Sequence, residues 1–143
     1  MHLYESHRSL TLEAALNLAQ IGQECAREAG FAMNVVVVDA GGLELALLRN
    51  PKAPDASLEF AKRKAYTAAS YGWPTAQWSE IVAQRPVVMQ GLSQNEKICL
   101  IAGGIPVTLD GETLGAIGVA GAKAPEDHQV AQAAIDRFLK QAK

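Results

Sequence analysis

The sequence has little of what marks a disulfide-bonded or membrane protein. Its 143 residues include only two cysteines, Cys25 and Cys99, without a motif spacing, and a chain of this size would need more of them for a disulfide framework. No apolar run approaches the ~18 residues of a membrane span, and the first residues hold no apolar core of signal-peptide length. These absences favour a cytoplasmic protein with free thiols and no membrane partner.

The chain also carries little net charge and lacks the common catalytic motifs. The formal net charge is −2, which argues against nucleic acid as the main partner because such proteins usually present a basic face. We find no P-loop, no dinucleotide fingerprint, no nucleophile elbow, and no His-x-Glu or Cys-x-x-Cys metal spacing. Fold is therefore easier to infer than function.

Apolar periodicity and turn residues predict one α+β domain over residues 1–143. Helices are expected over three long segments and one short one: residues 12–29, 57–70, a short helix from Thr75, and a last helix from about Pro125. Strands are expected over five segments: residues 35–38, 43–49, 98–102, 105–109 and 113–119. Short turns, such as the one at Asp110-Gly111, indicate antiparallel pairing. The predicted architecture is a five-stranded antiparallel sheet flanked by helices.

Several short motifs occur in a fixed order along the chain. They are the glycine corner after Asp39, the helical segment 64–69, the Pro74-Thr75 turn, the segment 103–106 and the glycine-rich run 115–121. In this order they resemble the GlcG/HbpS-like family, and the PduO C-terminal domain is similar. The resemblance covers almost the whole chain. It implies a profilin-like fold, assembly into homo-oligomers, and binding of haem or a corrinoid, with haem degradation in some members.

One ligand site is expected at the turn between the last strand and the last helix. Gly118 and Gly121 leave the backbone open there, and N–H groups at a helix start favour a carboxylate or phosphate. A haem propionate or a small organic acid would suit this turn, with Lys123 beside it. Alternatively, Glu126 and Asp127 already complement the helix dipole.

Asp39 and Lys64 are the candidate acid/base groups. Asp39 ends a buried strand, where its carboxylate could position a ligand, transfer a proton, or cap the turn by bonding its own backbone. Lys64 and Thr67 lie one helical turn apart and could reach an anionic ligand; the structural alternative is an ion pair of Lys64 with Asp39 or Glu112. Arg49 closes its strand and could join this cluster or remain solvated.

Histidine is a usual ligand of haem iron, and the chain has three. His128, at the edge of the apolar stripe of the last helix, and His7, in an N-terminal tail, are the candidate iron ligands. A structural or solvated histidine is the alternative. Trp73 and Trp78 could line a pocket for a planar ligand or pack in the core or at a subunit contact.

Three functions stay open on the sequence. The favoured one is a small-molecule-binding protein for haem or a related tetrapyrrole or corrinoid. The second is a small cofactor-independent enzyme acting on a small organic acid, in which Asp39 and Lys64 transfer protons and the glycine turn stabilises an oxyanion. The third is a non-catalytic accessory oligomer. We expect a homo-oligomer in all three cases.

Overall fold

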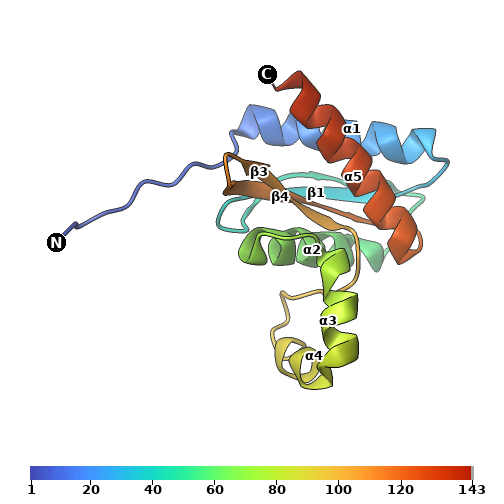
Figure 1. Cartoon of the computed structure of the whole chain (residues 1–143). Helices are drawn as coiled ribbons and strands as arrows, with labels where there is room; N and C mark the ends of the chain where they lie inside the picture. Colours follow the sequence, from blue (N-terminus) through green and yellow to red (C-terminus); the bar gives the residue numbers. More distant parts are fainter. Residues whose placement is uncertain (143) are drawn as a thin grey trace.

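The computed structural model describes residues 1–142 and contains a four-stranded antiparallel sheet between two helical layers (Figure 1). In spatial order the strands are β2 (Glu44–Leu48), β1 (Asn34–Asp39), β4 (Glu112–Ala120) and β3 (Gly104–Leu109). All three pairings are antiparallel. The predicted α+β class and antiparallel sheet are confirmed, whereas the profilin likeness stays a prediction.

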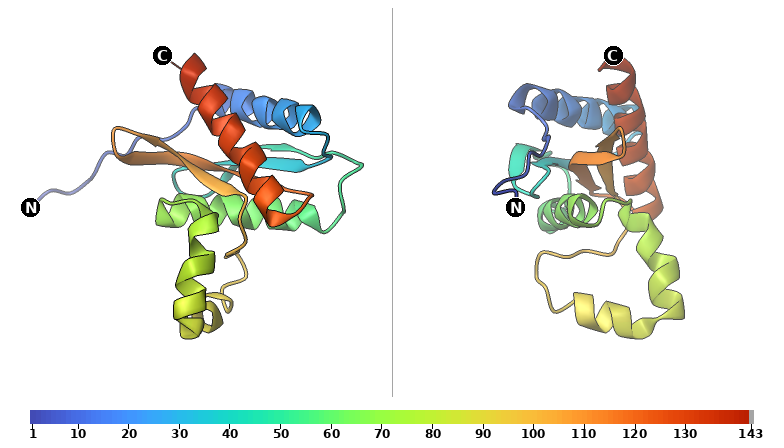
Figure 2. Two further views of the ribbon diagram at one scale, coloured as in Figure 1. Left: turned by 45° about the vertical axis from the view of Figure 1, so that its right-hand side comes forward. Right: turned by 60° about the vertical axis from the view of Figure 1, so that its left-hand side comes forward.

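Helices cover both faces of the sheet. One face carries α1 (Leu12–Glu28) and α5 (Ala124–Gln141), and the opposite face carries α2 (Ser57–Tyr71) (Figures 1 and 2). After α2 the chain leaves the sandwich through the short 3-10 helix η1 (Thr75–Gln77) and forms two short helices, α3 (Trp78–Gln84) and α4 (Pro86–Leu92), which project from the body. No helix within residues 1–142 is long and apolar enough to cross a membrane.

The alternation of side chains along β1 explains its uninterrupted run of valines. Val35 and Val37 belong to the larger core beneath α1 and α5, while Val36 and Val38 belong to a smaller core beneath α2. Successive side chains of a strand point to opposite faces, so a strand covered on both sides needs apolar residues at every position. The four consecutive valines in the sequence are what this double coverage requires.

The expected strand over residues 98–102 is not formed, so the prediction of five strands is wrong. Side chains of the α2 region take up hydrogen-bonding groups of this segment instead. The Thr67 hydroxyl accepts a hydrogen bond from Cys99 N at 2.9 Å, and the Thr75 hydroxyl donates one to Ile101 O at 2.7 Å. This apolar segment thus packs beside the helical layer rather than extending the sheet.

Helix α2 packs directly on glycines of β3 and β4. A Cβ atom at Gly118 would collide with the carbonyl oxygen of Ala61 and with Ala65, and one at Gly104 would collide with the carbonyl oxygen of Lys64. The alanines on this face of α2 are fully buried. The open backbone expected at Gly118 is therefore not found, because α2 fills the space. This close approach also brings the Lys64 side chain to the end of β4.

Candidate ligand sites beside helix α2

A cavity of about 280 Å³ lies where the first turns of α2 and α5 meet. Its wall includes Phe60, Lys64, Ile101, Gly121, Ala124 and Asp127. The structure thus brings together two of the predicted site residues, Lys64 and Gly121. It adds Asp127, which the sequence suggested only as a complement to the helix dipole.

Lys64 and Asp127 form a buried ion pair in the wall of this cavity. The Lys64 ammonium donates to Asp127 Oδ2 at 2.9 Å and to Val119 O at 3.1 Å, and both side chains are almost fully buried. Asp127 Oδ1 also accepts from Ala122 N at 3.0 Å. Burial raises the pKa of Asp127, an effect that the hydrogen bond from Lys64 opposes. The alternative of an ion pair between Lys64 and either Asp39 or Glu112 is therefore wrong, because the partner is Asp127.

Gly121 lies at the point where β4 ends and the chain turns into α5. Its φ of +150° suits glycine, and a Cβ atom would come within 2.6 Å of the Ala32 carbonyl oxygen. The neighbouring Lys123 is exposed, and its backbone N donates to Glu126 Oε1 at 3.1 Å. Two backbone amides at the predicted anion site, at the start of α5, therefore already donate hydrogen bonds to carboxylates of this chain, those of Asp127 and Glu126.

Asp39 lies apart from Lys64. Its Oδ1 accepts hydrogen bonds from Gly41 N at 2.9 Å and Leu43 N at 3.0 Å, the geometry of a turn cap. Asp39 pairs with Gly115 of β4, whereas Lys64 bonds Val119, four positions further along the strand. That spacing corresponds to about 13 Å. The two residues would have to act at different places on the molecule.

Thr67 and Arg49 do not join the Lys64 cavity. Thr67 is fully buried, and its hydroxyl donates to Arg63 O at 2.7 Å while accepting from Cys99 N. The Thr67 hydroxyl therefore makes hydrogen bonds within the fold rather than with a ligand in the cavity. Arg49 is exposed just beyond the end of β2.

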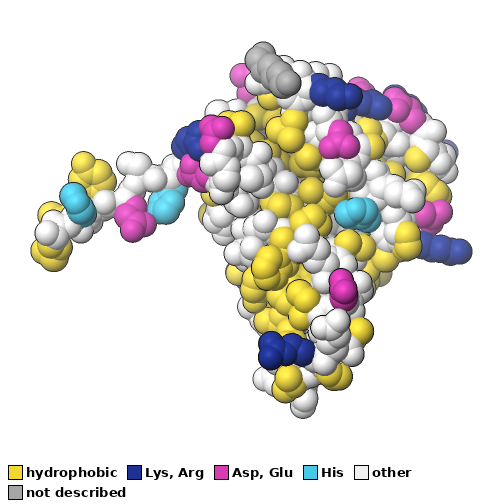
Figure 3. All heavy atoms as spheres, viewed as in Figure 1, with side chains coloured by type: hydrophobic (Ala, Val, Ile, Leu, Met, Phe, Trp, Pro, Cys, Tyr) yellow, Lys and Arg dark blue, Asp and Glu magenta, His cyan; other side chains and the backbone are white. Residues whose placement is uncertain are grey.

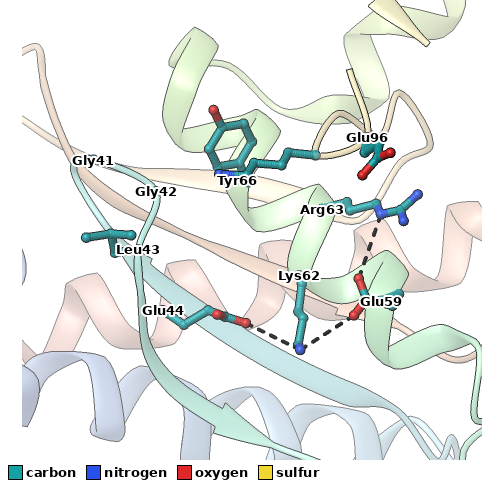
Figure 4. Close-up of a pocket in the computed structure, with 10 residues that line it drawn as sticks. Gly41, Gly42, Leu43, Glu44, Glu59, Lys62, Arg63, Tyr66 and Glu96 are labelled. Atoms are coloured by element: carbon teal, nitrogen blue, oxygen red, sulfur yellow. Dashed lines mark ion pairs between the residues drawn. The ribbon is translucent and has the colours of Figure 1, made fainter. Parts of the chain in front are cut away.

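A second, larger cavity of about 480 Å³ lies against the middle of α2 and the turn between β1 and β2 (Figure 4). The Tyr66 ring packs on Gly42, where any Cβ atom would meet it at 2.7 Å. Lys97 Nζ lies 5.5 Å from the centre of that ring. Lys62 is held between two carboxylates, Glu44 at 3.7 Å and Glu59 at 3.6 Å. This cavity offers an aromatic wall and charges of both signs. Sequence reasoning missed it because the residues come from separate segments and each has an ordinary surface role.

The two candidate iron ligands have different surroundings. His7 lies in the exposed N-terminal segment, 3.3 Å from Glu5. His128 lies near the start of α5 and is half-buried; its Nδ1 atom is buried and has no hydrogen-bond partner within residues 1–142. No group of three or more His, Cys, Asp or Glu side chains that could hold a metal ion occurs in the same range. Of these two histidines, only His128 combines a place on the folded body with an unused nitrogen.

The tryptophans pack with one another at the root of the projecting helices. The ring centroids of Trp73 and Trp78 are 5.3 Å apart, and Tyr71 stacks on Trp73 at 5.8 Å. The indole nitrogens of both tryptophans are buried without a hydrogen-bond partner in the described part of the chain. Separately, apolar side chains gather between α5 and α3 on the face of the molecule that Figure 3 shows.

Comparison with known proteins identifies the family. Residues 10–136 match the family model described as haem degrading protein HbpS-like. The chain belongs to the HbpS-like family. The membership inferred from the ordered glycine and helix motifs is thereby confirmed.

Three relatives show how far the likeness extends. An uncharacterised 15.0 kDa protein of Citrobacter freundii is 33% identical, over 91% of this chain and 92% of its own length. The crystal structure of a double mutant of HbpS from Streptomyces reticuli is 36% identical, with a TM-score of 0.85 over 94% of this chain and 90% of that one. The crystal structure of PduOC in complex with haem is 28% identical, with a TM-score of 0.80 over 90% of this chain and 94% of that one.

Proposed function

We propose that this chain binds haem or a closely related tetrapyrrole. The observation that carries the proposal is its similarity to PduOC, whose structure contains haem and which matches this chain along nearly its whole length. The family description, which names haem degradation, points to the same class of ligand. A corrinoid, also a large macrocycle, is the related ligand to compare.

The residues of this chain fit such a ligand at His128. Haem iron is commonly held by a neutral imidazole nitrogen, and the half-buried His128 has a ring nitrogen, Nδ1, without a hydrogen-bond partner within residues 1–142. Apolar side chains on the face between α5 and α3 would suit the faces of a macrocycle (Figure 3). His7 is the weaker candidate, because its exposed position provides no such apolar surroundings.

A haemin titration of the purified chain, followed by the Soret absorbance, tests this proposal. We expect a shifted and saturable Soret band at one haemin per chain. A parallel titration with iron-free protoporphyrin shows whether binding needs the iron. A second one with cobalamin shows whether the chain binds a corrinoid as well. A folded protein, judged by circular dichroism, that gives no saturable change with any of the three would overturn the proposal.

A further inference from the structure

A third cavity, of about 360 Å³, lies at the end of α1, where the chain enters β1 and leaves β2. Its wall combines Gln23, Arg27 and residues 30–32 with Asn50 and Lys52. None of these residues lines either of the two cavities beside α2. The volume falls within the range of sites for small molecules, roughly 300–1,000 Å³.

The charges in this wall have one sign. Arg27 and Lys52 are the only ionisable residues among those that line the cavity, and neither forms an ion pair within residues 1–142. The carboxylate nearest to Arg27 in sequence, that of Glu28, is engaged with Arg137 of α5 at 2.8 Å. Because a cleft lined by charges of one sign attracts the opposite ion, this cavity favours an anion.

Asn50 adds a neutral donor group to the two cations. Its Oδ1 accepts a hydrogen bond from Lys52 N at 2.9 Å, which fixes the orientation of the half-buried side-chain amide. The NH₂ group of that amide has no acceptor in the part of the chain that the structure describes. Gln23 differs, because its Nε2 already donates to Met33 O at 2.9 Å and to Leu48 O at 2.8 Å. Gln23 therefore holds the wall together, and Asn50 is left with N–H groups for a ligand.

We propose that this cavity binds a small dianion with oxygen acceptors, a dicarboxylate or a phosphate. Two negative charges balance Arg27 and Lys52, and a guanidinium can donate two parallel hydrogen bonds to a carboxylate or phosphate. Both cationic side chains are exposed, so each can turn toward a bound anion without giving up an ion pair. Phe31 and Ala32 provide an apolar surface for the carbon atoms of a ligand. None of these residues takes part in the haem binding proposed above, so either proposal can fail without the other.

An NMR titration of the full chain with succinate, and separately with inorganic phosphate, tests this proposal at neutral pH and constant ionic strength. We expect saturable changes in the backbone amide signals of residues 30–32, Asn50 and Lys52 at millimolar ligand or below. The two titrations distinguish a dicarboxylate from a phosphate. Acetate should bind at least about ten-fold more weakly than the better of the two, because its single charge leaves one cation without a charge-assisted hydrogen bond. No saturable change with either dianion, or equal changes with sodium chloride alone, would overturn the proposal.

Variants of the two cations show whether they form the site. Arg27→Gln and Lys52→Gln should each lower the affinity for the better dianion by at least about ten-fold, since each removes a charge-assisted hydrogen bond. Arg85→Gln is the matched control: it removes the same charge from an exposed arginine between α3 and α4 that does not line the cavity, and it should bind as the unmodified chain does. All three positions are exposed, and the amide spectrum of each variant shows whether the fold is kept. Unchanged affinity in the double variant Arg27→Gln with Lys52→Gln, or an equal loss in Arg85→Gln, would overturn the proposal.

Discussion

Lys64 and Asp127 are 63 positions apart in the sequence, and their side chains meet in a 2.9 Å ion pair that joins α2 to the start of α5. Both groups are almost fully buried. Removing one partner of such a pair leaves an uncompensated buried charge, which is far more costly than removing both. The pair therefore links α2 to the start of α5 in the wall of the cavity.

The first prediction concerns the stability supplied by this pair. Asp127→Ala should lower the free energy of unfolding by about 3–5 kcal/mol, because the Lys64 ammonium would remain buried without a counter-charge. The double variant Lys64→Met with Asp127→Leu should recover most of that loss. Urea denaturation followed by circular dichroism measures both.

A matched control lies on the same helix. Asp136 is exposed and accepts a hydrogen bond from Gln132 at 2.9 Å, so Asp136→Ala should change stability by less than about 0.5 kcal/mol. An Asp127→Ala cost as small as that of the control would contradict the stabilising role assigned to the buried pair.

The second prediction concerns the contact between α2 and the sheet. Gly118→Ala should destabilise the protein by about 1–3 kcal/mol, because the added methyl group collides with backbone and side-chain atoms of α2 at Ala61 and Ala65.

Gly91→Ala is the control: Gly91 lies within helix α4, and a Cβ atom there meets nothing within 4 Å. Alanine at position 91 should be neutral or stabilising by up to about 1 kcal/mol. Thermal unfolding of both variants gives the comparison, and equal effects would count against close packing at Gly118.

Much of the architecture was predictable because it depends on local patterns. The run of valines in β1, the Asp110-Gly111 hairpin and the Thr11 cap of α1 each have a short-range physical cause. In the structure Asp110 and Gly111 both have positive φ, and the Thr11 hydroxyl accepts from Ala14 N at 3.1 Å. Such features need no knowledge of what packs against them.

The errors arise where distant residues decide the outcome. Residues 98–102 form an apolar run typical of a strand, but the hydroxyl groups of Thr67 and Thr75 take up hydrogen-bonding groups of its backbone. The Lys64–Asp127 pair could not be chosen in advance either, because Asp127 had an adequate local role at the start of its helix. A glycine in a strand indicates a close approach, but only the tertiary structure shows whether a ligand or a helix makes it.

The third prediction concerns the N-terminal segment and pH. Arg8 holds Glu112 through its backbone N at 3.0 Å and its Nε at 2.6 Å. These hydrogen bonds place the pKa of Glu112 below its usual value of 4.5. A carboxyl group with a lowered pKa stabilises the folded contact above its usual pKa, and this contribution is lost as the pH falls through the lowered value.

Acid and Glu112→Gln should therefore have the same effect on this segment. We expect both to increase the mobility of residues 5–9, measured by backbone ¹⁵N relaxation, with Glu112→Gln doing so at neutral pH. Glu13→Gln, which changes an exposed residue in the first turn of α1, is the control. Unchanged relaxation in the Glu112 variant would show that the contact does not hold the segment.

The fourth prediction concerns assembly. The α3–α4 projection exposes large apolar side chains, with Val87 at 72% and Met89 at 47%, and exposed apolar surface often marks a protein contact. We expect the chain to sediment as a dimer or larger species at micromolar concentration and Val87→Lys to shift it toward monomer. Leu12→Lys, at a similarly exposed apolar position on α1 (65%), should not. A compact monomer in the unmodified protein would reject this prediction.

The haem proposal is tested most directly by comparing two histidine variants in the haemin titration. If His128 holds the iron, His128→Ala should weaken haemin binding by at least about ten-fold and alter the Soret position, as expected for loss of an axial ligand. His7→Ala removes an exposed histidine paired with Glu5 and should bind as the unmodified chain does. Unaltered binding in His128→Ala, or a loss confined to His7→Ala, would contradict the account.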